Sequence, residues 1–137
     1  MEIKKEEKFD FEALKQLYSD AGWYVYLKDD TRFQAMFDNA YVVYGAYQND
    51  KLVGVIRGVS DSVHILYIQD IIVLSNYRKQ GIGSALLKTM VNNHRAIRQK
   101  VLITDAFNEG ANAFYEACGF KKSHENKINC YIRFDIA

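Results

Sequence analysis

Two glycines and an arginine stand where an apolar stretch of the chain meets an amphipathic one. The run Ile71–Leu74 predicts a short buried strand, and Arg78, Gly81 and Gly83 follow it before a helical pattern begins. Glycines at such a turn let the backbone approach a ligand closely. The first N–H groups of the next helix have no partner within that helix, and they lie at the positive end of its dipole. The stretch therefore predicts an anion-binding turn whose ligand is a phosphate.

Two common phosphate loops do not fit this turn. A dinucleotide-binding loop favours a small residue three positions after Gly83, where Leu86 stands. A P-loop requires the sequence Gly-Lys-Ser/Thr, which the chain lacks. The local charge suits an anion, because residues 71–104 hold six Lys or Arg and no acid, which leaves the rest of the chain net acidic. An ordinary tight turn with a basic rim is the alternative.

The turn and a later segment together resemble one protein family. Arg78-x-x-Gly81-x-Gly83, directly after a strand, resembles the acetyl-CoA signature of the GNAT superfamily of N-acetyltransferases. The second segment resembles that family's N-x-x-A-x-x-F-Y-x-x-x-G-F helix, with Asn108, Ala111, Phe114, Tyr115, Gly119 and Phe120 at the matching positions. The resemblance covers nearly the whole chain. It implies an α/β fold with a mixed, mostly antiparallel sheet, central parallel strands that splay apart, and helices on both faces.

The resemblance also implies which residues bind acetyl-CoA, the acyl donor. Main-chain groups of the strand pair with the pantetheine arm, and one N–H polarises the thioester carbonyl. The N–H groups of the turn hold the pyrophosphate, with added charge from Arg78 and a hydrogen bond from the Ser84 hydroxyl. Asn108 contacts the cofactor, and a helix cap is its alternative role. The candidate cofactor-binding residues are Ile71, Ile72, Val73, Arg78, Lys79, Gln80, Gly81, Ile82, Gly83, Ser84 and Asn108.

Two residues are the candidate catalytic groups. The resemblance implies that Tyr115 is the general acid that protonates the departing CoA thiolate, whereas its place on an apolar helical stripe is also typical of a core tyrosine. Asp70 is the best-placed carboxylate to take a proton from an amine, directly or through water, or to hold the charge of the acceptor. Asp105 and Glu109 are weaker candidates, since both also fit a helix cap or a solvated charge.

The cysteines and histidines predict neither a disulfide framework nor a metal site. Cys118 and Cys130 could form at most one bridge, so a reducing cytoplasm is expected. Cys118 fits a small core residue better than an acyl-cysteine nucleophile. The three histidines have no metal-ligand spacing with either cysteine, so no metal is expected.

Length and composition predict one folded domain over residues 1–137. The chain is 49% hydrophobic and 14% aromatic, typical of a globular protein. A net charge of +1 argues against a nucleic-acid partner, including the tRNA of an acetylating toxin. No apolar run approaches the roughly 18 residues needed to cross a bilayer, so no membrane partner is expected.

Periodicity and turn residues place the elements along the chain. Helices are expected after Asp10, from Asp29–Thr31, after Gly81 and from Asn108 or Glu109. The expected strands are a weak edge strand within residues 2–8, Tyr41–Tyr47, Leu52–Val59, Val63–Leu74, a buried Val101–Ile103, and a C-terminal hairpin of Phe120–Ser123 with Ile128–Phe134.

The predicted activity is the transfer of an acetyl group from acetyl-CoA to a primary amine that attacks the thioester directly. The sequences Y-I-Q-D-I-I-V-L and R-Q-K-V-L-I-T-D resemble a bacterial GNAT subgroup likened to arylalkylamine or small-amine acetyltransferases. Protein or peptide N-acetylation is the alternative within the enzyme class. A non-catalytic acyl-CoA-binding module is the alternative outside it, and a homodimer is an open expectation.

An aromatic segment suggests the acceptor. Trp23, Tyr24 and Tyr26 follow the first helix, where relatives build the acceptor wall, and aromatic faces attract cations. With Asp29 and Asp30 nearby, they predict a small-molecule amine with an apolar or aromatic body. The alternative is an irregular aromatic turn that closes the core.

Overall fold

A five-stranded sheet lies at the centre of the first of two units in the computed structural model, which describes residues 1–136. This unit spans Met1–Ile103 and the second spans Thr104–Ala137. The strands follow one another in space as in sequence: β1 (Glu2–Lys5), β2 (Val42–Gln48), β3 (Lys51–Ser60), β4 (Ile65–Val73) and β5 (Gln99–Leu102). Pairing is antiparallel from β1 to β4 and parallel between β4 and β5. The predicted mixed, mostly antiparallel sheet is confirmed.

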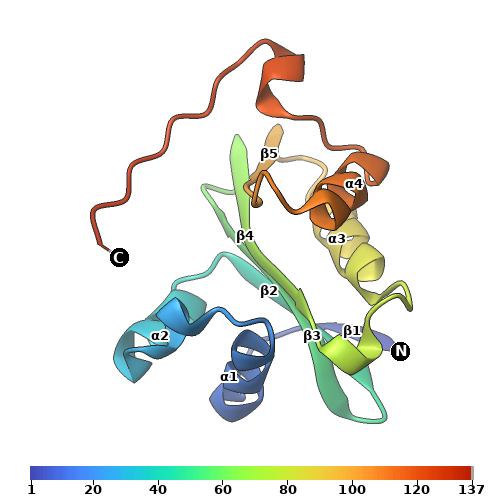
Figure 1. Ribbon diagram of the computed structural model, residues 1–137. Coiled ribbons are helices and arrows are strands. Elements are labelled where there is room, and N and C mark those ends of the chain that lie inside the picture. The colour runs from blue at the N-terminus through green and yellow to red at the C-terminus, as the bar shows by residue number, and fades with distance from the viewer. Residues whose placement is uncertain (137) are drawn as a thin grey trace. The chain divides into compact units, whose positions relative to one another are not determined.

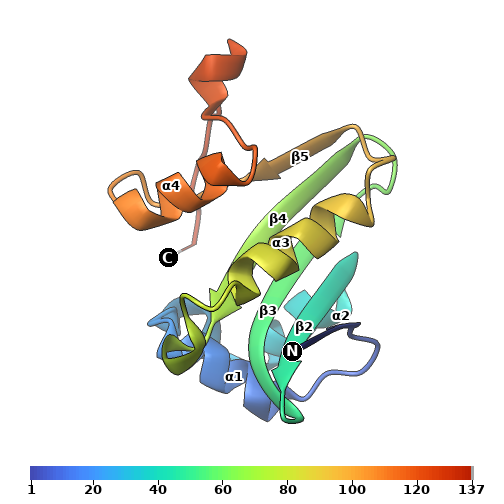
Figure 2. The same cartoon turned by 90° about the vertical axis from the view of Figure 1, so that its right-hand side faces the viewer.

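Helices cover both faces of this sheet (Figures 1 and 2). Helices α1 (Phe11–Asp20) and α2 (Asp30–Asp38) pack on one face, and α3 (Ile82–Asn92) packs on the other. The first face holds an aromatic core in which Tyr18 and Phe33 are fully buried. None of the helices within residues 1–136 is long and apolar enough to cross a lipid bilayer.

The helix starts and the hairpin turn that neighbouring residues predicted are confirmed. The Asp10 carboxylate accepts a hydrogen bond from Ala13 N at the start of α1, and Asp29 caps α2 in the same way. Asn49 and Asp50 both have positive φ values, 49° and 64°, as a two-residue hairpin turn requires. The segment Trp23–Tyr26, expected as an irregular turn, overlaps a short 3-10 helix, Tyr24–Leu27.

Two predictions about the last third of the chain are wrong. Strand β5 is half-buried rather than buried, because its side chains lie at the edge of the sheet. The C-terminal hairpin is absent from the described part of the second unit, where a 3-10 turn, Ser123–Asn126, follows helix α4 (Glu109–Ala117). The N–H groups of Lys127 and Ile128 donate to nearby carbonyls of this turn, and Lys127 is left-handed at φ 61°. Alternating apolar residues there do not make strands without a partner strand.

Candidate active site

Strand β4 loses one of its two neighbours halfway along its length. Its parallel pairing with β5 runs from Ile65↔Gln99 to Ile68↔Leu102 and ends there. Its antiparallel pairing with β3 continues to Gly54↔Val73. Within the described residues, β4 therefore presents an edge without a strand partner from Gln69 onward, which we call the open edge. A row of unpaired main-chain groups is a template for an extended ligand.

The direction of the main-chain groups along this edge follows from one hydrogen bond. Leu74 N–H donates to the Val53 carbonyl of β3 at 2.9 Å. Because main-chain groups alternate in an antiparallel pair, those of Ile72 also face β3, whereas those of Ile71 and Val73 face the open edge. Arg78 Nε donates to the Val73 carbonyl at 3.1 Å, as this orientation requires. Only Ile71 and Val73 therefore have main-chain groups that could pair with an extended ligand such as a pantetheine arm. Ile72 contributes a buried side chain instead.

The glycine turn ends in an exposed helix N-terminus. Lys79 and Gly81 have positive φ values, 62° and 83°, and Gly81 caps α3. The first hydrogen bond of the helix joins Ala85 N to the Gly81 carbonyl at 3.0 Å. The N–H groups of Ile82, Gly83 and Ser84 precede that bond, so the intrahelical ladder does not use them. A Cβ built on Gly81 meets no atom within 4 Å, so the space beside Gly81 is open, as the approach of a phosphate would require.

Two other polar side chains hold the segment that leads into the turn. Both Asp20 carboxylate oxygens accept from the Ser75 hydroxyl at 2.9 and 3.0 Å, and Ser75 N also donates to Asp20 at 2.9 Å. Arg78 Nη2 lies 3.9 Å from Asp20 Oδ2. The Arg78 side chain is half exposed and lies between the strand edge and Asp20, so its role toward phosphate stays a prediction. Sequence reasoning missed Asp20 and Ser75, which no local pattern connects.

Asp70 lies inside the sheet face rather than on its surface. Only 1% of its side chain is exposed. Its Oδ2 accepts from Arg57 Nε at 3.0 Å, from Arg57 Nη2 at 2.8 Å and from the Tyr18 hydroxyl at 2.6 Å. Its Oδ1 accepts from the Tyr26 hydroxyl at 3.2 Å. This arrangement favours a fixed buried anion over a base in contact with the acceptor, and the catalytic role of Asp70 stays a prediction.

Burial and the Arg57–Asp70 ion pair shift the pKa values of the groups around Asp70. Burial raises the pKa of Tyr18 well above its usual value, and the Asp70 charge raises it further. The pKa of Tyr26 is raised for the same two reasons. Burial alone would lower the pKa of Arg57, but the contacts with Asp70 and Tyr18 raise it overall. Both tyrosines therefore keep their protons and act as donors to Asp70 at neutral pH. Arg57, a charged residue inside an apolar strand, was a signal that sequence reasoning overlooked.

A cavity of about 550 Å³ lies beside the start of the open edge, and we call it the β4 cavity. Gln69 and Arg57 line it where β4 leaves β5. Val59, Ile65 and Tyr67 form its apolar wall, with Val59 and Ile65 about half exposed, and Ser60 and Asp61 add polar groups. The cavity therefore offers a partly apolar wall next to polar groups, a combination typical of small-molecule sites.

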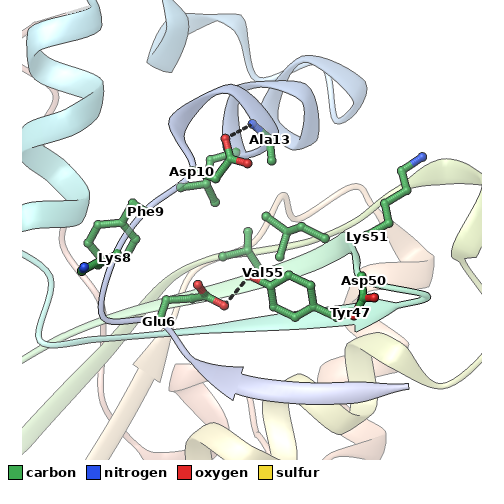
Figure 3. Close-up of a pocket in the computed structure, with 11 residues that line it drawn as sticks. Glu6, Lys8, Phe9, Asp10, Ala13, Tyr47, Asp50, Lys51 and Val55 are labelled. Carbon is green, nitrogen blue, oxygen red and sulfur yellow. Dashed lines mark hydrogen bonds between the residues drawn. The ribbon is translucent and has the colours of Figure 1, made fainter.

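A second cavity, of about 410 Å³, lies between the start of α1 and the β2–β3 hairpin (Figure 3). Figure 3 shows the Glu6 carboxylate and the Tyr47 hydroxyl pointing toward each other, and they are joined by a 2.7 Å hydrogen bond. Burial and this contact with Glu6 raise the pKa of Tyr47. None of the predicted site residues lines this cavity.

The aromatic segment is divided between core and surface. Tyr26 and Trp23 pack on the buried Tyr18 ring, with centroid distances of 5.3 and 6.0 Å. Tyr24 is 62% exposed. The two acids proposed to assist an acceptor have other partners. Asp29 caps α2, and Asp30 pairs with Lys15 at 2.9 Å.

Comparisons with known proteins identify the family of this chain. The model of the acetyltransferase (GNAT) family matches residues 3–120, which include the glycine turn and the segment from Asn108 to Phe120. The chain belongs to the GNAT family of acetyltransferases. A GNAT family acetyltransferase structure from Streptococcus pneumoniae TIGR4 is 33% identical, with a TM-score of 0.85, and the match covers 98% of this chain and 97% of that one.

Two less similar structures share the fold. An aminoglycoside acetyltransferase from an uncultured soil metagenomic sample is 19% identical, with a TM-score of 0.73 and coverage of 99% of this chain and 95% of that one. The ribosomal-protein-S18-alanine N-acetyltransferase from Escherichia coli is 23% identical, with a TM-score of 0.74 and coverage of 88% and 77%. No curated protein sequence matches the chain significantly.

The second GNAT motif lies in the second unit. Asn108 caps α4 by accepting from Ala111 N at 3.0 Å, so the predicted alternative role as a cap is confirmed and a contact with acetyl-CoA stays a prediction. Tyr115 is half-buried, and its ring lies 5.2 Å from that of Phe114. Asp105 accepts from Phe107 N, as a turn residue does. Cys118 and Cys130 are both free thiols.

Proposed function

We propose that this GNAT enzyme transfers the acetyl group of acetyl-CoA to a small primary amine with an apolar or aromatic body. One observation carries the proposal: the open edge of β4 begins beside a cavity of about 550 Å³ with a partly apolar wall. That volume lies within the range of small-molecule sites. A donor bound along the edge would meet an acceptor bound in the cavity.

The donor side draws on the open edge and the turn. Main-chain groups of Ile71 and Val73 would hydrogen-bond the pantetheine amides as an added strand does. The N–H groups of the turn, from Lys79 and Gln80 to Ser84, would hold the pyrophosphate at the positive end of the α3 dipole. Acetyl-CoA supplies the activated acyl group. Asn108 and Arg78 remain proposed contacts to it.

The acceptor side needs a neutral amine. An alkyl ammonium first loses its proton to solvent, and the free amine nitrogen then attacks the thioester carbonyl carbon. A C–N bond forms, the C–S bond breaks, and the CoA sulfur leaves with the electron pair. An N–H of the open edge would stabilise the negative charge that develops on the carbonyl oxygen. In this proposal the Tyr115 hydroxyl protonates the sulfur, and the nitrogen loses one proton to solvent as the amide forms, while Tyr115 takes a proton back from solvent.

A panel of amines tests the acceptor class. Purified protein with acetyl-CoA would be given tyramine-like amines, polyamines, aminoglycosides and lysine peptides at equal concentration, with CoA thiol release as the readout. Fastest turnover is expected with the amine that carries an aromatic or apolar body. Fastest turnover of lysine peptides would instead assign the chain to protein acetylation. Acetyl-CoA binding without turnover of any amine would indicate a binding module.

A further inference from the structure

The geometry points to Gln69 as the residue that receives the acceptor amine, with Asp70 as a positioning residue that acts on Gln69 through Tyr26. This inference rests on the proposed acetyl transfer and names the contact that selects its acceptor. It assigns the acceptor contact to a neutral amide rather than to a carboxylate.

Gln69 stands where two irregularities of β4 coincide. The β3–β4 register passes from Arg57↔Asp70 directly to Gly58↔Ile68, so Gln69 has no partner on β3 and forms a β-bulge. Pairing with β5 ends at Ile68, one residue earlier. Bulges redirect side chains and are frequent beside active sites. Gln69 is therefore the first residue of the open edge, and it lines the β4 cavity.

The hydrogen bonds around Gln69 show which end of its side-chain amide is already engaged. The Asp70 carboxylate, paired with Arg57, only accepts hydrogen bonds, so the Tyr26 hydroxyl must donate its single proton to it. The Tyr26 oxygen is then an acceptor, and Gln69 Nε2 donates to it at 3.0 Å. Because the amide nitrogen is held by Tyr26, the amide oxygen Oε1 is the end left for a ligand in the cavity.

The buried charge of Asp70 is kept away from the acceptor. Three donors converge on its Oδ2, and its side chain is 1% exposed. A carboxylate in direct contact with an ammonium would make that ammonium harder to deprotonate, because an opposite charge favours the charged form. A neutral carbonyl oxygen binds an amine N–H with a weaker effect of this kind. At Gln69 the network thus presents a hydrogen-bond acceptor without a negative charge, and the carboxylate that lines the cavity is that of Asp61.

The chemistry of the cavity specifies the class of acceptor. The nitrogen of a primary amine would donate to Gln69 Oε1, and its carbon body would lie on Val59, Ile65 and Tyr67. The Asp61 carboxylate also lines the cavity, and its Oδ1 accepts from three main-chain N–H groups, those of Val63, His64 and Ile65. An acceptor with several separated charges would therefore meet one acid beside an otherwise apolar wall. The inference therefore favours monoamines with an apolar body over polyamines and aminoglycosides.

Two tyrosine variants separate positioning from stability. Tyr26→Phe removes the hydroxyl that joins Asp70 to Gln69, and Tyr18→Phe removes a hydroxyl that bonds Asp70 but has no hydrogen bond to Gln69. We expect Tyr26→Phe to raise the KM for the amine about tenfold, as the loss of one positioned hydrogen bond predicts, without changing the KM for acetyl-CoA. Tyr18→Phe should lower the melting temperature and leave the KM for the amine unchanged.

A double-mutant cycle and an NMR signal complete the test. Gln69→Met keeps the side-chain length, and adding Tyr26→Phe to it should raise the amine KM no further if the two residues act as one unit. The side-chain amide signal of Gln69 should shift in Tyr26→Phe and on addition of the amine. If the wild type is active and Tyr26→Phe has the same KM for the amine, the role of Gln69 is overturned, whereas the proposed acetyl transfer stands. A protein that binds acetyl-CoA and acetylates no amine overturns the proposed function as well.

Discussion

Replacing Gly81 with alanine tests the anion-binding turn without removing a side chain. Gly81 has φ 83°, and the added Cβ would meet no atom within 4 Å. The cost to folding is therefore the left-handed backbone alone, about 1 kcal/mol. For a chain of this length such a loss lowers the melting temperature by about 3 °C.

Gly22 provides a matched control. It has φ 77°, and a Cβ built there also meets no atom within 4 Å. It lies two residues after Asp20, which bonds Ser75 ahead of the turn, but Gly22 itself is not part of the Lys79–Ser84 turn. Gly22→Ala and Gly81→Ala should therefore lose the same stability, and any difference between them reports the ligand site.

Acetyl-CoA binding should separate the two variants. At Gly81 the new methyl group would occupy the space through which a phosphate approaches the N–H groups of the turn. A hydrogen bond to a charged group is worth about 1.5–3 kcal/mol, so its loss should raise the Kd roughly tenfold or more. Calorimetric titration of acetyl-CoA into both variants and the wild type measures this, with thermal unfolding as the stability check. Equal affinity of the two folded variants would refute the assignment of the phosphates to this turn.

Three further predictions follow from single groups. Tyr115→Phe should lower kcat roughly 10- to 1000-fold with stability nearly unchanged, and unaltered turnover would make Tyr115 a packing residue. Asp70→Asn should lower the free energy of unfolding in urea by about 3–5 kcal/mol, because it leaves the Arg57 charge buried without its partner; a loss below about 1 kcal/mol would contradict the buried pair. The pKa of His94 is lowered by burial and by nearby lysines, so its contribution to stability is present above pH 6.5 and is lost as the pH falls below that value. Wild-type stability should accordingly fall more than that of His94→Gln between about pH 7 and about pH 5.5, and parallel losses would exclude His94 as the cause.

Features that depend on neighbouring residues were predictable from the sequence. Asp10, Asp29 and Asn108 cap their helices, because a side-chain oxygen needs only an N–H two or three residues later. Gly81 adopts the left-handed conformation for an equally local reason. The predicted mixed, mostly antiparallel sheet follows from these elements together with the resemblance to the GNAT family.

Features that depend on distant pairing were not predictable. Tyr18 and Asp70 are 52 residues apart in the sequence, and nothing near either one indicates that they form a 2.6 Å hydrogen bond. The bulge at Gln69 changes the register of one strand by a single residue, which leaves no mark in an apolar pattern. The prediction of a C-terminal hairpin was wrong because it relied on a local pattern. The alternating residues indicated strands, but a strand also needs a pairing partner, which the local pattern does not reveal.

The Arg57–Asp70 pair explains how β4 can carry an open edge within a stable sheet. The strand loses its β5 ladder after Ile68 and its regular β3 ladder at Gln69, within two consecutive residues. Asp70, the next residue, is joined to Arg57 of β3 by two hydrogen bonds and to α1 by the Tyr18 hydroxyl. A buried pair of this kind adds little net stability compared with apolar packing, but it is costly to break. Its value here is geometric: it holds β4 against β3 and α1 at the point where the strand must leave one neighbour free for a ligand.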